Sequence, residues 1–564
     1  MRPKKKAGKT ARHRMMSVCV HSVCRMYVLD RAWSLLDEHV SLILGRIRAR
    51  DNDFLVNVRS MLRFEYQSAE SNKTLFQIQA FFSKRRDGAD DKECTAAAVK
   101  RFWEGEELCR KTNLRLRELF MQEKHEQLDI YRQVDTMRRV IKRVLGDLDL
   151  PLVLSQGRVT SGASSTRSRQ RALPHFKCNE LVYTTSKARP LVEAFVAQFF
   201  PELRLRVVDK NANRIAFVPK SIKTHRTIAA ENESNLFFQL AIDAYLKKRL
   251  RQACNIDLLD QSHNQERARE GSITGEWATV DLSMASDTLS LELVPYLFPE
   301  DWTSLLEALR SPFFQGPFGS GVYQKFSSMG NGFTFPVETL VFYAACIAVG
   351  SRAPLVYGDD IVIESELVPE LEVLLRTLGF TFNAEKSFSS GPFRESCGAD
   401  FWHGHNVRPI FFKSWSNLNT MQLCQLVNDI VNIVDTPGHL WDYAASLVRG
   451  HRLPLVPVGA STTSGVLVVA GLMDQRILHT HGGITTYKCL SSYERTRIAY
   501  GRRNYMLWHF MKLTSEEDFI ATLVATLRPR IRMGKARWSH PSERPPTRCY
   551  SWSVFINNYV KNNL

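Results

Sequence analysis

The sequence predicts an α+β fold, with helical parts at both ends and a central part in which short strands alternate with helices. Three observations lead to this prediction. No proline lies between Pro3 and Pro151, which permits long helices. After residue 171, short apolar runs alternate with helical stretches, and from about residue 416 the pattern is mainly helical again. A chain of 564 residues, 44% hydrophobic and 24% charged, has the composition of an ordered protein with several cores, which excludes a small binding module.

The individual elements follow from periodicity. A 4-3-4-3 apolar spacing predicts one face of a helix at Ile130, Val134, Met137, Ile141 and Val144. Residues 155–171 hold five Ser, two Gly and four Arg without an acid, which predicts a mobile basic loop and a domain boundary. Strands are predicted at residues 215–218, 278–282, 355–357 and 361–363, and helices at 235–253, 335–349 and 369–378.

The charge balance favours a polyanionic partner. The net charge is +18, and residues 1–14 carry seven of the cations and no acid. The remaining surplus of 11 is spread over the body of the chain, for which nucleic acid is the natural counter-ion. The longest apolar run, residues 340–350, is too short to span a bilayer, so no membrane attachment is expected. Scattered cysteines without a Cys-x-x-Cys pair are typical of reduced thiols in a cytoplasmic protein.

Residues 355–363, LVYGDDIVI, predict a hairpin with Gly358, Asp359 and Asp360 at its turn. Two adjacent carboxylates at such a tip repel each other unless a divalent cation neutralises them. The tripeptide alone is a weak signal. The pair Asp90–Asp91 has no flanking strands and is expected to lie in a solvated loop.

A third acid, Asp281, follows the predicted strand in WATVDLSMASD (residues 277–287). If it faced the hairpin tip across a sheet, Asp281, Asp359 and Asp360 could hold two Mg²⁺ ions for in-line phosphoryl displacement. The alternative is that Asp281 caps the N-terminus of the following helix. The local sequence leaves both interpretations open.

Two further segments have the residue types that phosphate and ribose need. Residues 327–336, SSMGNGFTFP, hold two glycines that let a backbone pass close to a ligand, with Ser and Asn side chains in reach of a ribose. An ordinary helix entry explains the same pattern. Lys220, Lys223 and Arg226 follow a predicted strand at spacings of three and could grip a triphosphate, or they could form a solvated basic loop.

Taken in order, these segments resemble the catalytic β subunit of the replicases of single-stranded RNA bacteriophages, the Qβ-type RNA-directed RNA polymerases. The resemblance is close over residues 210–415. It rests on VPKSIKTHRTIA (218–229), DQSHNQERAREGS (260–272), ATVDLSMASDTLS (278–290), SSMGNGFTFPVETLVF (327–342), VYGDDIVI (356–363) and NAEKSFSSGPFRESCG (383–398).

The resemblance implies roles for individual residues. Catalytic Mg²⁺ ions, two in number and replaceable by Mn²⁺, would bind Asp281, Asp359 and Asp360. Incoming nucleoside triphosphates would bind Lys220, Lys223 and Arg226, and Lys386 would protonate the leaving pyrophosphate. The loop residues Ser328, Gly330 and Asn331 would position template and nucleotide. Many RNA polymerases place a sugar-checking acid five residues after the first metal ligand; here that position is Ser286 and the next is Asp287, so ribose selection is expected from one of these with Asn331.

The resemblance also implies a right-hand polymerase: a palm with an antiparallel sheet and helices, and largely helical fingers and thumb. The expected divisions are an N-terminal region and fingers (1–215), fingers with the basic nucleotide-binding motif (216–273), palm (274–415, with a fingers insertion at about 301–324), and thumb with C-terminal region (416–564). Basic stretches at 495–503 and 528–548 would line the RNA exit. RNA template and product are the expected partners, together with host elongation factors Tu and Ts and a ribosomal small-subunit protein, in the host bacterial cytoplasm.

Two other functions stay open at this stage. A reverse transcriptase-like polymerase shares the palm and a Tyr-x-Asp-Asp hairpin, although Gly358 and Asn331 favour ribonucleotides. A basic RNA-binding structural protein, which is not an enzyme, accounts for the charge but not for the three acids.

Overall fold

The computed structural model describes most of the chain between residues 20 and 490, and one strand near the C-terminus. The described residues are 20–30, 37–49, 51, 69–83, 90–121, 128–160, 162–168, 177, 181–199, 205–221, 223–411, 418–433, 438–468, 478–481, 484–490 and 550–556. They form two compact units. One unit consists of residues 90–407, and the other combines the described residues before 84 with those after 407.

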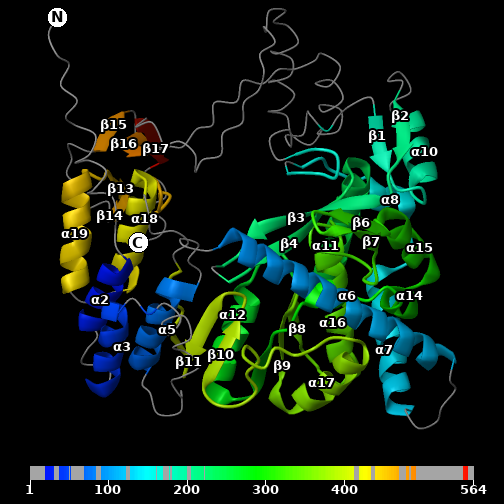
Figure 1. Cartoon of the computed structure of the whole chain (residues 1–564), viewed down its shortest axis with the longest axis horizontal. Coiled ribbons are helices and arrows are strands. Elements are labelled where there is room, and N and C mark those ends of the chain that lie inside the picture. Colours follow the sequence, from blue (N-terminus) through cyan, green and yellow to red (C-terminus); the bar gives the residue numbers. More distant parts are fainter. Residues whose placement is uncertain are drawn as a thin grey trace, which may run out of the picture. The chain divides into compact units, whose positions relative to one another are not determined.

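The unit of residues 90–407 contains both helices and sheets (Figure 1). Its helices are α6 (Asp91–Met121), α7 (Leu128–Leu145), α8 (Leu150–Leu154), α10 (Arg189–Phe199), α11 (Glu233–Cys254), α12 (Ser262–Thr274), α13 (Ala285–Thr288), α14 (Leu293–Leu297), α15 (Glu300–Leu309), α16 (Thr334–Ala348), the 3₁₀ turn η5 (Ser365–Leu367) and α17 (Val368–Thr377). Its strands are β1 (Leu181–Thr184), β2 (Arg206–Asp209), β3 (Ala212–Pro219), β4 (His225–Ala230), β5 (Trp277–Val280), β6 (Phe313–Gly316), β7 (Gly319–Val322), β8 (Leu355–Tyr357), β9 (Asp360–Glu364), β10 (Phe393–Ser396), β11 (Ala399–Trp402) and β12 (His405–Asn406).

Two sheets carry the segments of functional interest. The antiparallel sheet β5-β9-β8 contains the predicted hairpin as β8 and β9, and β5 lies on the other side of β9. Residues 381–388 run along the free edge of β5 through backbone bonds to Thr279, Asp281 and Ser283. The second sheet has the order β4-β3-β6-β7. Each predicted strand and helix of this unit is confirmed to within three residues at either end.

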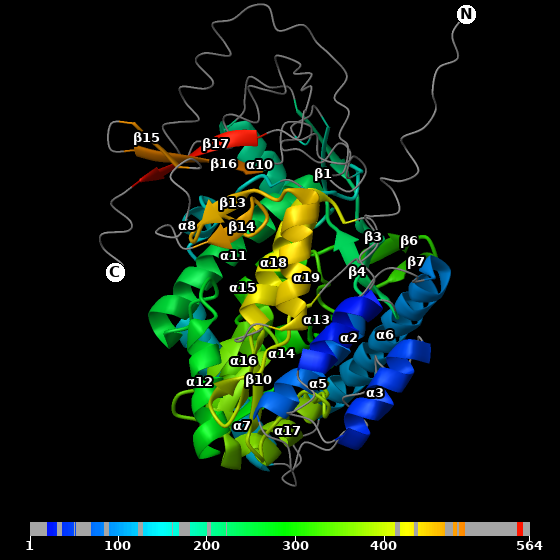
Figure 2. The same ribbon diagram turned by 90° about the vertical axis from the view of Figure 1, so that its left-hand side faces the viewer.

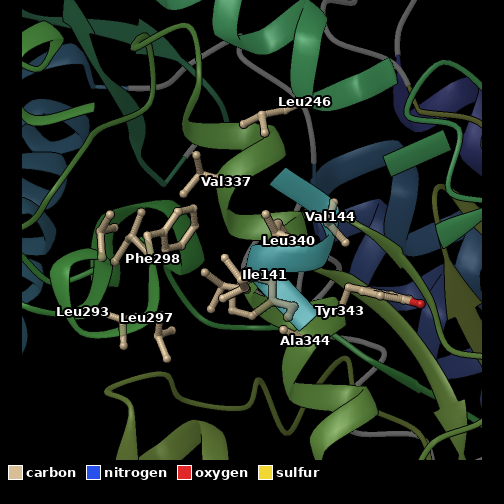
Figure 3. Packing of buried hydrophobic residues seen from close by; sticks show 14 of the residues in the cluster. Ile141, Val144, Leu246, Leu293, Leu297, Phe298, Val337, Leu340, Tyr343 and Ala344 are labelled. Atoms are coloured by element: carbon tan, nitrogen blue, oxygen red, sulfur yellow. The ribbon is translucent and has the colours of Figure 1, made fainter. Parts of the chain in front are cut away.

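The core of this unit lies around α16, which is apolar on almost every side. It packs against α7 and α11, and Figure 3 shows Ile141 and Val144 of α7 beside Leu340 and Ala344 of α16. The 4-3-4-3 stripe of α7 is therefore confirmed as the buried face. Burial of each such side chain contributes roughly 1.5–3 kcal/mol to stability, and this packing fixes the helix on which the hairpin turn rests.

Helix α6 crosses the second sheet (Figure 1) and packs against β4. Near its first turn the carboxylate of Asp91 lies 2.7 Å from Nε2 of His225, the first residue of β4. Three turns further on, Phe102 packs against Ile215 of β3 and Ala229 of β4. Asp90 and Asp91 are exposed, as expected of a solvated pair, but the expected loop is wrong because the pair stands at the start of α6.

The segment after residue 155 also differs from its prediction. Ser164 and Ser165 are buried, and both donate hydrogen bonds to residues near the start of α11. Ser164 Oγ donates to the Glu233 carboxylate at 2.6 Å, and the Ser165 amide donates to the Glu231 carbonyl at 2.9 Å. Arg214 donates to the Ser164 carbonyl at 2.9 Å. A segment with few apolar residues is thus fixed largely by hydrogen bonds, and the described part of it is no mobile loop.

The second unit has a helical core with small sheets beside it (Figure 2). Its helices are α2 (Val20–Asp30), α3 (Asp37–Ala49), α5 (Ala69–Ser83), α18 (Thr420–Ile433) and α19 (His439–His451), and its strands are β13 (Leu455–Pro457), β14 (Val466–Val468), β15 (Leu478–His481), β16 (Ile484–Leu490) and β17 (Tyr550–Ile556). Asp30 of α2 accepts from the amides of His439 and Leu440 at 2.8 and 2.7 Å and so caps α19. The prediction of a mainly helical end is only partly right, because the described residues after α19 form five strands.

Several expectations fall on residues outside the described ranges, namely the basic N-terminal tail (1–14) and the basic stretches 495–503 and 528–548. Within the described ranges, no helix combines the length and the apolar character needed to cross a membrane.

Candidate active site

Strand register brings the three predicted acids to one end of the sheet β5-β9-β8. Val280 of β5 pairs with Ile361 of β9, so the next positions along this antiparallel ladder, Asp281 and Asp360, lie opposite each other. Tyr357 pairs with Asp360 across the hairpin, which leaves Gly358 and Asp359 as its two-residue turn. The alternative role of Asp281 as a helix cap is wrong, because α13 begins only at Ala285, with Met284 in the capping position.

The carboxylate of Asp281 is held from the far edge of β5 by the segment that follows α17. Asn383 Nδ2 donates to Oδ2 of Asp281 at 2.7 Å, and Nζ of Lys386 lies 3.7 Å from the same oxygen. Burial raises the pKa of Asp281, Lys386 and Asn383 oppose the rise, and the charges of Asp359 and Glu395 add to it. The one cation in this contact therefore does not fully compensate the acids around it.

Asp360 lies deeper than Asp281 and is less well compensated. Its Oδ1 accepts from the backbone amide of Cys397 at 3.2 Å. The pKa of Asp360 is raised to about 6: burial contributes most, this hydrogen bond opposes the rise, and the charges of Asp359, Asp281 and Glu395 add to it. Carboxylates whose pKa values are raised by one another are the arrangement that an added cation stabilises.

Glu395 is a fourth acid at this position, which the sequence did not single out. It lies on β10, and its amide donates to Thr279 Oγ1 of β5 at 3.3 Å. Its charge acts on Asp281, Asp360 and Lys386. The signal available in the sequence was its place in FRESCG (residues 393–398), two residues before Cys397, whose amide binds Asp360.

The residues present fit a magnesium site of the kind that is completed by substrate. Their donors are carboxylate oxygens, which Mg²⁺ prefers, and Mg²⁺ is commonly held by one or two carboxylates together with substrate phosphates. In the described part of the chain, no three Asp, Glu, His or Cys side chains are close enough to hold an ion by themselves. Phosphate oxygens from a ligand would therefore be needed to complete the coordination.

The hairpin turn rests directly on α16. Gly358 has φ +63°, and its amide donates to Thr339 Oγ1 at 3.1 Å. A Cβ at this position would come within 2.4 Å of the Phe335 ring, so only glycine fits. Glu338 lies beside Thr339, fully enclosed, and burial followed by the charges of Asp359 and Asp287 raises its pKa well above the ordinary range. Glu338 was not predicted, because a lone acid inside an apolar helix gives no motif.

Cations from three separate segments gather next to Asp281. Partial desolvation of the Lys220 ammonium, followed by repulsion from Arg226, Arg101 and Lys386, lowers the pKa of Lys220, and Asp281 partly opposes this. The carboxylates of Asp281, Glu395, Asp360 and Asp359 outweigh burial and raise the pKa of Lys386. Lys223 is exposed in the β3–β4 connection and is not among the charges that act on Lys220. The structure thus brings Lys220, Arg226 and Lys386 together, and adds Arg101 of α6.

Asp287, predicted as a sugar-checking residue, belongs to a buried ion-pair network. Its Oδ1 lies 2.7 Å from Nζ of Lys325, whose other acidic partner is Glu106 of α6 at 3.6 Å. Lys325 is 1% exposed. Burial favours the neutral amine, but the charges of Asp287 and Glu106 raise the pKa of Lys325. Ser286, one position earlier in α13, is half-buried.

The glycine loop lies against the protein's own backbone. Gly330 has φ +114°, and a Cβ there would come within 2.2 Å of the Ala229 carbonyl oxygen, while the Ala229 amide donates to the Met329 carbonyl at 2.8 Å. The close approach thus serves β4, in contrast to the expected approach to a ligand. Ser328 is buried. Asn331 accepts from the Phe333 amide at 3.0 Å, and its buried Nδ2 has no hydrogen-bond partner among the described residues.

Comparison with known proteins gives a consistent result. Residues 67–442 match the family model described as RNA replicase, beta-chain. The chain is 39% identical over 328 residues to the "RNA-directed RNA polymerase subunit beta" of Escherichia virus Qbeta, a match that covers 57% of this chain and 55% of that relative. It is 34% identical over 443 residues to the protein of the same name from Qbeta virus (strain MX1), covering 75% of this chain and 74% of the relative.

A solved structure of an RNA-dependent RNA polymerase, that of BmCPV in its elongation state, is similar at a TM-score of 0.38 and 10% identity, over 57% of this chain and 33% of that one. The family match extends over two thirds of the chain and includes the end of the sheet where the acids meet. The chain therefore belongs to the RNA replicase beta-chain family.

Proposed function

We propose that this chain is an RNA-directed RNA polymerase that replicates a single-stranded RNA phage genome, adding nucleoside monophosphates to an RNA 3′ end and releasing pyrophosphate. The observation that carries the proposal is the register that sets Asp281 opposite Asp360 beside Asp359, with a group of cations adjoining. Phosphoryl transfer asks mainly for alignment and charge neutralisation, and this arrangement supplies acids for metal ions and cations for phosphates. Family membership supports the same activity.

In this proposal Asp281, Asp359 and Asp360 hold two Mg²⁺ ions, for which Mn²⁺ can substitute. When bound, the ions would lower the pKa of the attacking 3′-hydroxyl and neutralise charge on the leaving pyrophosphate. Asn383 keeps the Asp281 carboxylate oriented, and the Cys397 amide does the same for Asp360. Gly358 and Thr339 fix the hairpin turn on α16, so the acids are preorganised by backbone geometry.

Lys220 and Arg226 would bind the triphosphate of the incoming nucleotide, with Lys223 at their edge. Lys386 would donate a proton to the departing pyrophosphate. Its raised pKa keeps it protonated at neutral pH, and its Nζ lies 3.7 Å from the Asp281 carboxylate.

Ribose selection would involve Asn331 together with Ser286 or Asp287. The buried Nδ2 of Asn331, without a partner among the described residues, is a donor that a 2′-hydroxyl could satisfy. Oδ1 of Asp287 already contacts Lys325, so within the described structure Oδ2 is the oxygen that remains free to accept a further hydrogen bond from a ligand. A deoxynucleotide would leave the Asn331 donor unsatisfied, which favours ribonucleotides over the reverse transcriptase-like alternative.

The finer architecture belongs to the same proposal. A right hand would use the sheet β5-β9-β8 with α16 and α17 as palm, and the sheet β4-β3-β6-β7 with α6 as part of the fingers. RNA template and product, elongation factors Tu and Ts and a ribosomal small-subunit protein would be its partners in the host cytoplasm, as the resemblance implies.

The decisive experiment tests whether the purified full chain copies a defined RNA, with and without host lysate. Incorporation of radiolabelled nucleotides measures the copying. We expect ribonucleotides to be incorporated with Mg²⁺, deoxynucleotides far less, and EDTA to abolish incorporation while RNA stays bound. Equal use of deoxynucleotides would favour the reverse transcriptase-like alternative. RNA binding without incorporation under every condition would favour the structural protein.

A further inference from the structure

We infer that Arg101 of α6 is a further triphosphate-binding residue, which completes the cation group formed by Lys220, Arg226 and Lys386. The inference rests on the proposed polymerase function and deepens it. Arg101 lies about 120 residues before the basic motif in the sequence and was not among the predicted site residues.

The first argument is the path of α6 between two fixed points. Near its start, Asp91 contacts His225, which is followed directly by Arg226. Further along, Gly105 and Cys109 meet the backbone of Asp287: a Cβ at Gly105 would lie 3.3 Å from the Asp287 carbonyl oxygen, and Cys109 Sγ lies 3.4 Å from it. The helix therefore spans the distance from the basic strand β4 to the segment that carries the first acid.

The second argument is the helical position of Arg101. It lies four residues before Gly105, hence one turn and roughly 6 Å away on nearly the same face. Ala98, one turn before it, and Phe102, the next residue around the helix, are buried, and Phe102 packs on Ile215 and Ala229 of the basic hairpin β3–β4. Arg101 itself is exposed, so its side chain leaves the edge of the buried stripe with its charge in solvent.

The third argument is charge. Arg101 acts on Lys220 together with Arg226 and Lys386, so four cations from α6, β4 and two loops converge. Within the described part of the chain, neither Arg101 nor Lys220 nor Arg226 has an ion-pair partner, whereas most exposed arginines of α6 and α7 have one, such as Arg110 with Glu107. Cations held together without acids are stabilised by a compact polyanion, and a nucleoside triphosphate beside Asp281 has that charge density.

The test compares Arg101→Ala with Lys100→Ala, a matched control one residue away. Lys100 is 80% exposed and pairs with Glu104 on the outer side of α6. The KM for each ribonucleotide, kcat and the unfolding midpoint would be measured on the full chain with the same host lysate in every reaction. For Arg101→Ala we expect KM to rise about tenfold, the effect of losing one charge-assisted contact. We expect kcat within about threefold of wild type and an unchanged unfolding midpoint, since no buried contact is lost. Arg101→Lys should recover part of the loss.

A second readout needs no catalysis. Calorimetric titration with inorganic triphosphate should show a Kd about tenfold higher for Arg101→Ala than for Lys100→Ala. If wild type copies RNA and both variants keep the wild-type KM and triphosphate Kd, the assignment of Arg101 is overturned while the proposed function stands. If RNA affinity falls with KM unchanged, Arg101 binds the nucleic acid backbone and the assignment is likewise overturned. Failure of wild type to copy RNA would overturn the proposed function, and the titration would still decide on Arg101.

Discussion

The chain contains two Asp-Asp pairs in the same unit, and they are used in opposite ways. At Asp90–Asp91 both charges have partners within the protein: Asp90 Oδ1 accepts from the amides of Lys92 and Glu93 at 2.7 and 3.3 Å, and Asp91 contacts His225. At Asp359–Asp360 the surroundings are acidic. Asp281 and Glu395 add negative charge, and the pKa of Asp360 rises to about 6 as burial and these charges act together.

The difference shows what separates a structural acid from one that awaits a ligand. The amides at the start of α6 bind Asp90, Nε2 of His225 contacts Asp91, and both acids remain exposed to solvent. The second pair is held by backbone geometry, and its charge is only partly compensated, which for Asp360 costs stability in the absence of a cation. Identical dipeptides therefore gain their function from the strands or helices that flank them.

The largest effect is expected from Asp359→Asn set against Asp91→Asn. Asp359→Asn should reduce nucleotide incorporation on the order of a thousandfold or more, since it removes charge from the proposed metal site, while RNA binding persists. Asp91→Asn keeps a hydrogen-bonding group opposite His225 and should leave incorporation within about threefold of wild type. Incorporation on a defined template and filter binding of RNA measure the two properties. Comparable activity in both variants would remove the distinction between the pairs.

Lys325→Met tests how much the buried ion pairs of Lys325 with Glu106 and Asp287 contribute to stability. It leaves Glu106 and Asp287 without the cation that both contact, and Glu106 is buried. Breaking a buried ion pair from one side costs about 3–5 kcal/mol, so we expect the free energy of unfolding to fall by that order. Urea denaturation followed by circular dichroism measures it, and Lys100→Ala, which loses only an exposed pair, should change by less than about 1 kcal/mol. A stable Lys325→Met would mean that the network is not required for folding.

Much of the unit of residues 90–407 could be predicted because its signals are local. Hydrophobic periodicity predicts the buried stripe of α7 and the apolar helix α16, and the turn residues predict the hairpin of β8 and β9. The segment around Ser164 could not be predicted from composition, because its hydrogen bonds go to Glu231 and Glu233, more than 65 residues away. After α19, the strands β13, β14 and β15 have only three or four residues each, too few for a periodic pattern. The strands β16 and β17 have seven residues each, and the prediction of a mainly helical end missed them.

The candidate site shows the same division. The acids at 281, 359 and 360 could be expected together, since strand ends in one sheet meet at one edge. Arg101, Lys325 and Glu338 could not, because each is a single charge whose partners come from distant elements. Glu395 lies in a segment that carries the resemblance, but nothing in the sequence assigned it a role of its own. The role of Gly330 was misjudged because the sequence shows that a glycine permits close approach, but not to which backbone.

Asp360→Asn should stabilise the protein, in contrast to changes at Asp90. The folded-state pKa of Asp360 is raised from 3.8 to about 6, so ionisation costs folding free energy above pH 6, and this cost disappears as the pH falls from about 6 to about 4. At pH 8 without Mg²⁺ we expect a gain of about 1–3 kcal/mol for Asp360→Asn, because the amide oxygen can still accept from Cys397. Urea denaturation at pH 8 and pH 4 measures the gain. A gain that does not change with pH would show that its origin is not the charge.

The smallest effect is expected from Asp90→Ala, which completes the contrast. Asp90 satisfies two amides at the start of α6, and loss of such a cap typically costs about 1 kcal/mol. Asp90→Ser restores an acceptor without charge and should recover most of that loss, which separates the hydrogen bonds from the interaction of the carboxylate with the helix N-terminus. Urea denaturation at low and high salt measures both contributions. The nucleotide KM should change little in either variant, because the remaining contacts of α6 with β4 and Asp287 still hold Arg101 in place. A large rise in KM for Asp90→Ala would mean that the start of α6 controls the position of Arg101.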